Sequence, residues 1–242
     1  MKKILLLFLL IVSASLFYNS HAQSQFTGWV SSFNTFKTGK KISIHNDIQW
    51  RSTDGIKQMQ TFLFRVGMNV HLKKNLIVTA GYAFTSNRRT ISGINDYLPE
   101  HRIWEQLIVT HKLKNIFTTH RFRIEQRFIS QKIAVNNQLE NNGHVYANRF
   151  RYFFRNILPF KKQTSFQKGV FVALQDEVFV NFGNTAGVNG EFFDQNRFYV
   201  AAGYRISPKA DIEIGYINQY VNGRGDAFTK NNIVQLASYL RL

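Results

Sequence analysis

Charged side chains recur at every second position in two segments of this 242-residue chain. Residues 121–127 carry Arg, Arg, Glu and Arg at alternate positions, and residues 149–155 carry Arg at three of four. Because successive side chains of a β-strand point to opposite faces, this spacing gathers the charges on one face. Guanidinium groups pair with carboxylates and other anions, so this charged face can form an ion-pair network or attract anionic solutes. The candidate pore-lining residues are Asp47, Arg65, Arg121, Arg123, Glu125, Arg127, Arg149, Arg151, Arg155, Glu177, Arg205 and Glu213.

Catalytic chemistry finds little support in the sequence. The chain has no cysteine, which excludes a disulfide framework, a thiolate metal site and a cysteine nucleophile. His111 and His120 are expected to be neighbours on the outer face of one hairpin, but no serine joins them to form a lipase- or deacylase-type site. We therefore predict no catalytic residue, no metal site and no cofactor. The alternative is a lipid-modifying barrel enzyme of the phospholipase or deacylase type.

The segments that must position these charges alternate apolar and polar residues with period two, which is typical of strands. In residues 60–72, for example, Phe62, Phe64 and Val66 share one face, while Thr61 and Arg65 lie on the other. Such runs exceed the usual 5–6 residues of soluble strands and match the ~9–11 residues of a strand that crosses a bilayer. The runs are 41–51, 60–72, 76–84, 101–113, 116–130, 145–160, 170–183, 197–207, 211–222 and 232–242, with a weaker one at 26–37.

The connections between these runs alternate in length. Tight turns are expected at 73–75, 114–115 and 208–210, with a mid-sized turn at 161–169 in the same series. Long polar loops are expected at 86–99, 131–144, 184–196 and 222–231. Short turns at one end and long loops at the other are typical of an outer-membrane barrel. The prediction is an all-β, antiparallel transmembrane barrel of about 10–12 strands, with short periplasmic turns and longer extracellular loops. The alternative is a soluble lipocalin-like barrel or a sandwich.

Two details of this prediction stay open. Eleven runs conflict with the even strand number of simple bacterial barrels, so 26–37 is a plug or a short closing strand, or a twelfth strand lies in a long loop. Glu105 and Asp176 fall on apolar faces, so either a β-bulge turns them inward or the register is wrong there. A hairpin centred on Lys114 and Asn115 would place Gln106 opposite Arg123.

The strong positive charge, 31 Lys and Arg against 14 acids, divides by residue type. Most lysines fall at the expected short turns, where the ammonium groups stay in water near anionic headgroups. The arginines fall within strands and should point inward, because a cation that faces lipid at mid-bilayer costs about 2–4 kcal/mol. Since the basic residues alternate with lipid-type side chains in an exported chain, no nucleic-acid partner is expected.

The first residues have the pattern of a secretory signal. Met1-Lys2-Lys3 precedes an apolar run over 4–17, and Ser20-His21-Ala22 offers a cleavage site after Ala22. The expected organisation is a cleaved signal peptide at 1–22 and one barrel domain at 23–242. No later stretch has the roughly 18 apolar residues of a membrane helix.

Several segments carry a resemblance to a known family. They are Ala22-Gln23, Gly28-Trp29, and residues 100–106, 120–127 and 149–152. Together they resemble Bacteroidetes-type outer-membrane barrels that are catalogued only as a domain of unknown function. The resemblance covers essentially the whole mature chain and implies placement in the outer membrane of a Gram-negative cell. It implies no activity, so no catalytic residue is carried over.

The sequence therefore predicts an outer-membrane barrel of unknown specific role. It is either a narrow anion-preferring, porin-like pore or a closed structural barrel with an Arg-lined lumen. The expected partners are outer-membrane lipid and small anionic solutes.

Overall fold

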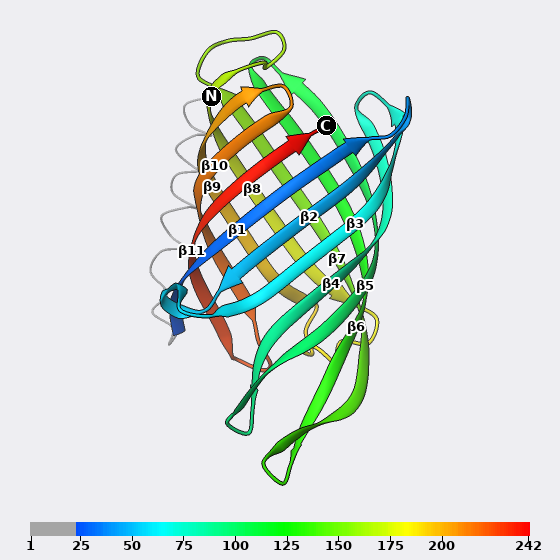
Figure 1. Cartoon of the computed structure of the whole chain (residues 1–242), viewed down its shortest axis with the longest axis vertical. Helices are drawn as coiled ribbons and strands as arrows, with labels where there is room; N and C mark the ends of the chain where they lie inside the picture. The colour runs from blue at the N-terminus through cyan, green and yellow to red at the C-terminus, as the bar shows by residue number, and fades with distance from the viewer. Residues whose placement is uncertain (1–22) are drawn as a thin grey trace, which may run out of the picture.

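The computed structural model describes residues 23–242 as a closed barrel of eleven strands (Figure 1). The predicted signal peptide, residues 1–22, lies outside the described residues. No helix in the described part of the chain is long and apolar enough to cross a membrane. The strands are β1 (Gln23–Lys37), β2 (Ile42–Ser52), β3 (Met59–Lys73), β4 (Leu76–Ile91), β5 (Ile94–Leu113), β6 (Ile116–Val135), β7 (Gln138–Pro159), β8 (Gly169–Phe182), β9 (Phe193–Ser207), β10 (Ala210–Asn222) and β11 (Phe228–Arg241). A short 3-10 helix, η1 (Asp54–Ile56), connects β2 to β3.

The barrel closes between its first and last strands. β1 pairs with β11 in parallel, from Gln23 opposite Thr229 to Thr35 opposite Arg241. Strands of a meander alternate in direction, so the eleventh runs the same way as the first and this pair cannot be antiparallel. The prediction of an all-antiparallel sheet is therefore wrong for this pair and right for the other pairs within residues 23–242. The weak segment 26–37 is part of a full-length closing strand, and no plug or twelfth strand occurs among the described residues.

Two of the four predicted long loops are wrong. β4 and β5 are joined by Ser92 and Gly93 alone, and β6 and β7 by Asn136 and Asn137 alone. All four turn residues have positive φ, which is the geometry of tight two-residue hairpins. The polar residues expected in loops instead continue the strands as two ribbons that project beyond the barrel (Figure 1, bottom). They are polar because neither face of these projecting ribbons is covered by the barrel.

The two ends of the barrel differ in composition. We call the end with the connections 38–41, 74–75, 114–115, 160–168 and 208–209 the lysine rim, and the opposite end the hairpin rim. The turn at 114–115 confirms the predicted hairpin, with Gln106 opposite Arg123. The lysines at the lysine rim are Lys37, Lys40, Lys41, Lys73, Lys74, Lys112, Lys114, Lys161, Lys162, Lys168 and Lys209.

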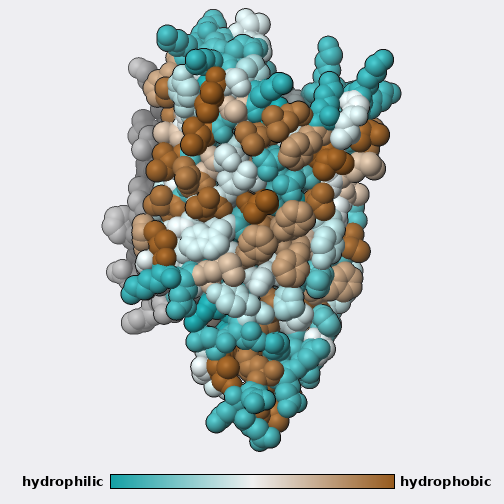
Figure 2. Space-filling view, in the orientation of Figure 1, coloured by the Kyte–Doolittle hydropathy of each residue, from teal (hydrophilic) through white to brown (hydrophobic). Residues whose placement is uncertain are grey.

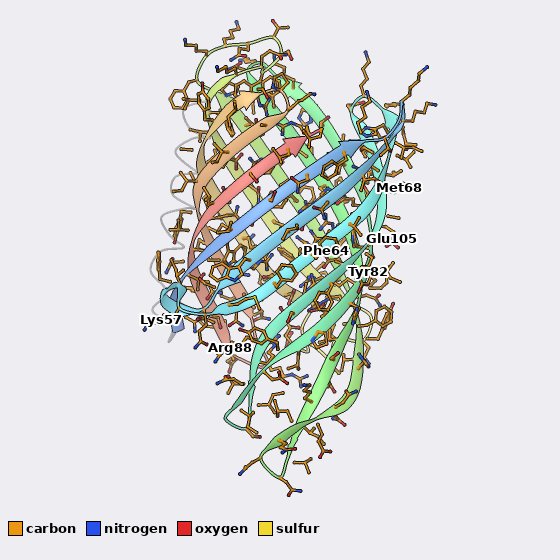
Figure 3. All side chains as sticks on the ribbon, viewed as in Figure 1. Lys57, Phe64, Met68, Tyr82, Arg88 and Glu105 are labelled. Carbon is orange, nitrogen blue, oxygen red and sulfur yellow. The ribbon has the colours of Figure 1, made fainter. Side chains whose placement is uncertain are left out.

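Polar side chains fill much of the interior, whereas apolar side chains cover much of the outside. Figure 2 shows apolar groups spread over the wall between two hydrophilic ends. Phe64, Met68 and Tyr82 are exposed on the wall made by β3 and β4 (Figure 3). Inside, Arg123 and Glu125 are fully buried. A soluble barrel would show the opposite distribution.

The interior also contains aromatic side chains. Trp104 on β5 is fully buried, and a Cβ added to Gly67 would lie 2.7 Å from its ring. Gly81 makes similar room, because the two glycines face the ring from β3 and β4. On the opposite side, Phe171 and Tyr199 belong to an apolar cluster from β8 to β11 and β1. These rings therefore occupy part of the interior beside the charges.

Glu105 and Asp176 lie on the outer face in regular register, so neither a bulge nor a register error turns them inward. Each pairs with an amide on the adjacent strand. Gln126 donates to Glu105 over 3.2 Å, and Asn196 donates to Asp176 over 2.9 Å. The regular register therefore excludes both proposed explanations. Each carboxylate stays on the outer face, where the amide of the adjacent strand is its hydrogen-bond partner.

Candidate functional site

One carboxylate, Glu125 on β6, is the centre of the interior charges. Its side chain is fully buried and accepts hydrogen bonds from Arg149 and Arg151 on β7, each with a shortest contact of 2.6 Å. The strand register explains these contacts, since Glu125 lies directly opposite Arg149. Three further guanidinium groups approach the same carboxylate, at 3.8 Å from Arg65, 3.9 Å from Arg102 and 3.9 Å from Arg123.

Two more acids extend this network around the wall. Glu177 on β8 accepts from Arg121 and from Arg151, each at 2.7 Å. Arg151 therefore bridges Glu125 and Glu177 and ties β6, β7 and β8 together. On β2, Asp47 accepts from Arg65 at 2.7 Å.

Further pairs lie towards the two rims. Glu100 on β5 accepts from Arg102 at 2.8 Å and from Arg127 at 2.5 Å. At the lysine rim Arg205 pairs with the neighbouring Asp211 at 2.7 Å. A cross-barrel pair joins Arg155 on β7 to Glu213 on β10.

Guanidinium groups also lie over aromatic rings in the middle of the barrel. Arg123 lies 4.6 Å from the centroid of Trp104, and Arg151 lies 4.4 Å from that of Phe179. Such contacts are favourable when water is excluded. Ion pairs and rings therefore lie together in the middle of the barrel.

The structure places all twelve predicted lining residues inside the barrel, where each pairs with an opposite charge. Their role in a conduction path stays a prediction. Sequence reasoning missed Glu100 and Arg102, although both share the alternate positions of Gln106 and are bonded to the network. It also omitted Arg51 and Arg197, which line the cavity described next.

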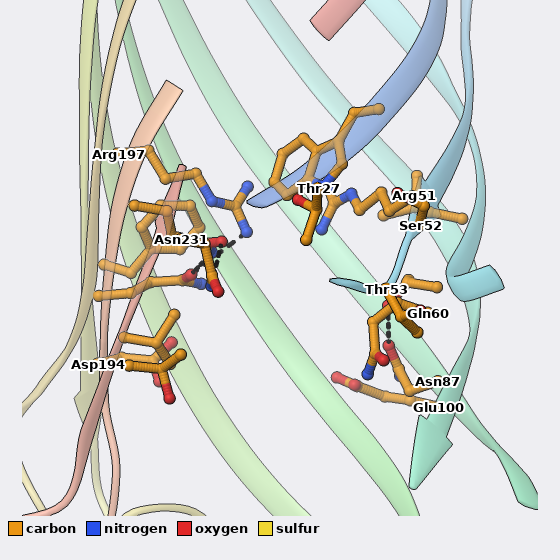
Figure 4. A pocket seen from close by; sticks show the side chains of 18 of the residues that line it. Thr27, Arg51, Ser52, Thr53, Gln60, Asn87, Glu100, Asp194, Arg197 and Asn231 are labelled. Atoms are coloured by element: carbon orange, nitrogen blue, oxygen red, sulfur yellow. Dashed lines mark hydrogen bonds between the residues drawn. The ribbon is translucent and has the colours of Figure 1, made fainter. Parts of the chain in front are cut away.

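The interior opens at the hairpin rim into a cavity of about 460 Å³, which we call the vestibule (Figure 4). Its lining contains eight arginines and two acids, Glu100 and Asp194, an excess of six positive charges. Amide and hydroxyl side chains such as Gln60 and Asn231 complete the lining. This chemistry is suited to anions. Among residues 23–242, no group of three or more His, Asp or Glu side chains could hold a metal ion.

Two groups that contain histidine have contacts of the kind found in catalytic sites. His111 and His120 stack on the outer face with ring centroids 5.2 Å apart, and His120 Nδ1 contacts the Tyr152 hydroxyl at 2.9 Å. At the lysine rim Ser43 Oγ contacts His71 Nε2 at 2.9 Å, a pair that sequence reasoning missed. No carboxylate in the described chain forms an ion pair with His71 that would orient it as a base.

Comparison with known proteins gives a family but no activity. The family described as "Protein of unknown function (DUF2490)" matches residues 26–230. An uncharacterised protein of Methylorubrum extorquens is 23% identical over 220 residues, which cover 88% of this chain and 86% of that protein. No solved structure matches the chain.

Proposed function

The chain belongs to the DUF2490 family of proteins of unknown function, and we propose that it is an outer-membrane barrel closed at mid-height by its buried ion pairs. The observation that carries this proposal is the reversed polarity of the wall. Ile103 and Met68 are half exposed outside, while Arg123 and Glu125 are fully buried inside.

Lipid is the partner that fits the outer surface. Exposed aliphatic and aromatic side chains in water would be costly at roughly 25 cal/mol per Å², whereas acyl chains solvate them. An arginine turned outward at mid-bilayer would cost about 2–4 kcal/mol, so the inward position of Arg65 and Arg151 fits the same environment. The lysine rim would meet anionic headgroups on the periplasmic side, and the hairpin ribbons would project outward into water.

The strand number does not oppose this proposal. Bacterial outer-membrane barrels usually have even numbers, but an odd-stranded barrel occurs in the mitochondrial outer membrane. Pairing β1 with β11 removes both sheet edges, and unpaired backbone groups are what a membrane barrel must avoid.

The buried rings and ion pairs in the middle of the barrel favour a closed barrel over a narrow pore. An anion crossing the barrel would have to displace buried rings and separate Arg151 from two carboxylates. A lipid-modifying activity has less support, because within residues 23–242 neither His111 nor His120 is hydrogen-bonded to a serine, and the Ser43–His71 pair has no carboxylate in an ion pair with His71.

Single-channel recording in planar bilayers tests the closure. Wild-type protein should give no unitary steps. Trp104→Ala should admit current, because it removes the largest fully buried side chain beside Arg123. Trp50→Ala is the matched control, since Trp50 lies on the outer face of β2 and its removal should leave the barrel silent. Steady anion-selective steps from the wild type would overturn the closure and support the pore.

A further inference from the structure

Arg51 and Arg197 differ from the other partly or fully buried arginines of the vestibule lining because, among the described residues, neither forms an ion pair with a carboxylate; Arg89, which also lacks one, is exposed. Arg51 on β2 donates to Gln49 Oε1 at 2.6 Å, and Arg197 on β9 donates to Gln195 Oε1 at 3.3 Å. Each buries its Nε atom without a hydrogen-bond partner. A buried cation without an anion is unfavourable, so these two groups would gain most from a bound anion.

The guanidinium groups of Arg51 and Arg197 both lie over the ring of Trp29. Their Cζ atoms lie 4.1 Å and 5.1 Å from the ring centroid of Trp29 on β1, so they are at most about 9 Å apart, the sum of those distances. Figure 4 shows Arg51 and Arg197 reaching into the vestibule from opposite walls. Both groups line the vestibule beside Trp29, so a ligand in this cavity can reach both.

The surrounding charge strengthens the site. Of the eight arginines in the vestibule lining, most are already paired with acids. Even when the deeper acids Asp47, Glu125 and Glu177 are counted with the two lining acids, eight arginines leave an excess of three positive charges. A cavity of one sign concentrates ions of the other.

We propose that the vestibule binds a small phosphate-bearing molecule, with Arg51 and Arg197 as a two-sided clamp. Phosphate oxygens are arranged tetrahedrally, so one phosphate group can accept from two arginines on opposite sides. A carboxylate can also accept from two guanidinium groups, as Glu125 does, but it carries one negative charge, whereas a phosphate monoester carries about 1.5–2 at pH 7. Nearby amides, such as Gln60 and Asn231, can bind hydroxyl groups of an attached sugar. This site is independent of conduction and of the membrane.

Isothermal titration of the full chain in detergent with inorganic pyrophosphate tests the proposal. Wild-type protein should bind it, with an affinity that falls as salt rises. Arg51→Gln and Arg197→Gln should each weaken binding about tenfold or more, as loss of a charge-assisted contact predicts. The matched control is Arg88→Gln, which removes the same charge from β4 near the same rim but outside the vestibule lining.

Three results of this titration would overturn the site. They are no pyrophosphate binding by the wild type, equal weakening by Arg88→Gln, and equal affinity for citrate, which would remove the preference for phosphate. Glucose 6-phosphate should bind where glucose does not. Binding of anionic lipid vesicles in place of free pyrophosphate would assign the phosphate to a headgroup and refute a small-molecule ligand.

A stability measurement separates ligand binding from a structural role. Because Arg51 and Arg197 have no acid to leave unpaired, their Gln variants should unfold at wild-type denaturant concentrations or above. Arg151→Gln removes a partner of both Glu125 and Glu177 and should lower the midpoint clearly. If Arg51→Gln and Arg197→Gln lowered it equally, the two arginines would be structural and the proposal would fail.

Discussion

Replacing Glu125 by Gln tests whether the central carboxylate stabilises the barrel. The change keeps the shape of the side chain but removes the one negative charge that five guanidinium groups share within 4 Å. It also turns an amide donor toward Arg149 or Arg151. Three charge-assisted hydrogen bonds from Arg149 and Arg151, of about 1.5–3 kcal/mol each, are weakened or lost, and broken buried pairs typically cost 3–5 kcal/mol. We expect Glu125→Gln to lower the free energy of unfolding by about 3–5 kcal/mol.

The assay is urea unfolding in lipid vesicles, followed by tryptophan fluorescence. Glu140→Gln is the matched control, because it makes the same change at an exposed position of the β7 ribbon that projects beyond the barrel. It should stay within about 0.5 kcal/mol of wild type, as is usual for exposed sites. If Glu125→Gln also stayed within 1 kcal/mol, the idea that Glu125 compensates the arginines would be wrong.

Three other predictions follow from local geometry. Gly81→Val should prevent folding, measured by the gel-mobility shift of folded barrels, because a Cβ there would lie 2.2 Å from a backbone oxygen. Hydrogen bonding from Lys132 lowers the pKa of Asp96 from its ordinary value, so this contact stabilises the fold at neutral pH and is lost as the pH falls through the lowered pKa; carboxyl NMR should show that Lys132→Ala raises the pKa of Asp96 toward its ordinary value. Replacing Lys73 and Lys74 by Glu should reduce insertion into anionic vesicles more than into zwitterionic ones; equal loss would contradict a headgroup role.

Most of the barrel was predictable because its strands are long and strictly alternating. The alternation of apolar and polar residues identifies the inward face of β6 from its own sequence, without knowledge of the adjacent strands. The Lys114-Asn115 turn then sets the register of Gln106 against Arg123. The closing pair was not predictable, because the parallel contact of β1 with β11 joins segments some 200 residues apart and leaves no local signal. The ribbons at 86–99 and 131–144 were taken for loops because an uncovered ribbon and a loop share the same polar composition.

The candidate site shows the same division. Alternation alone predicted that Arg149 and Glu125 point inward, because the side to which a residue points depends only on its position in its own strand. Which charge pairs with which depends on the curvature that brings distant walls together, so the absence of an ion pair at Arg51 and Arg197 could not be predicted from the sequence. A pair such as Arg155 and Glu213 joins β7 to β10, which are not neighbours in the sheet.

The most direct test of the reversed polarity is fluorescence quenching by lipids with brominated acyl chains, measured on variants that retain one tryptophan. The outward Trp50 should be strongly quenched, and the fully buried Trp104 should be unaffected. Quenching of Trp104 with Trp50 unchanged, or a folded protein that stays in solution without detergent or lipid, would contradict a barrel that turns its apolar side toward the membrane.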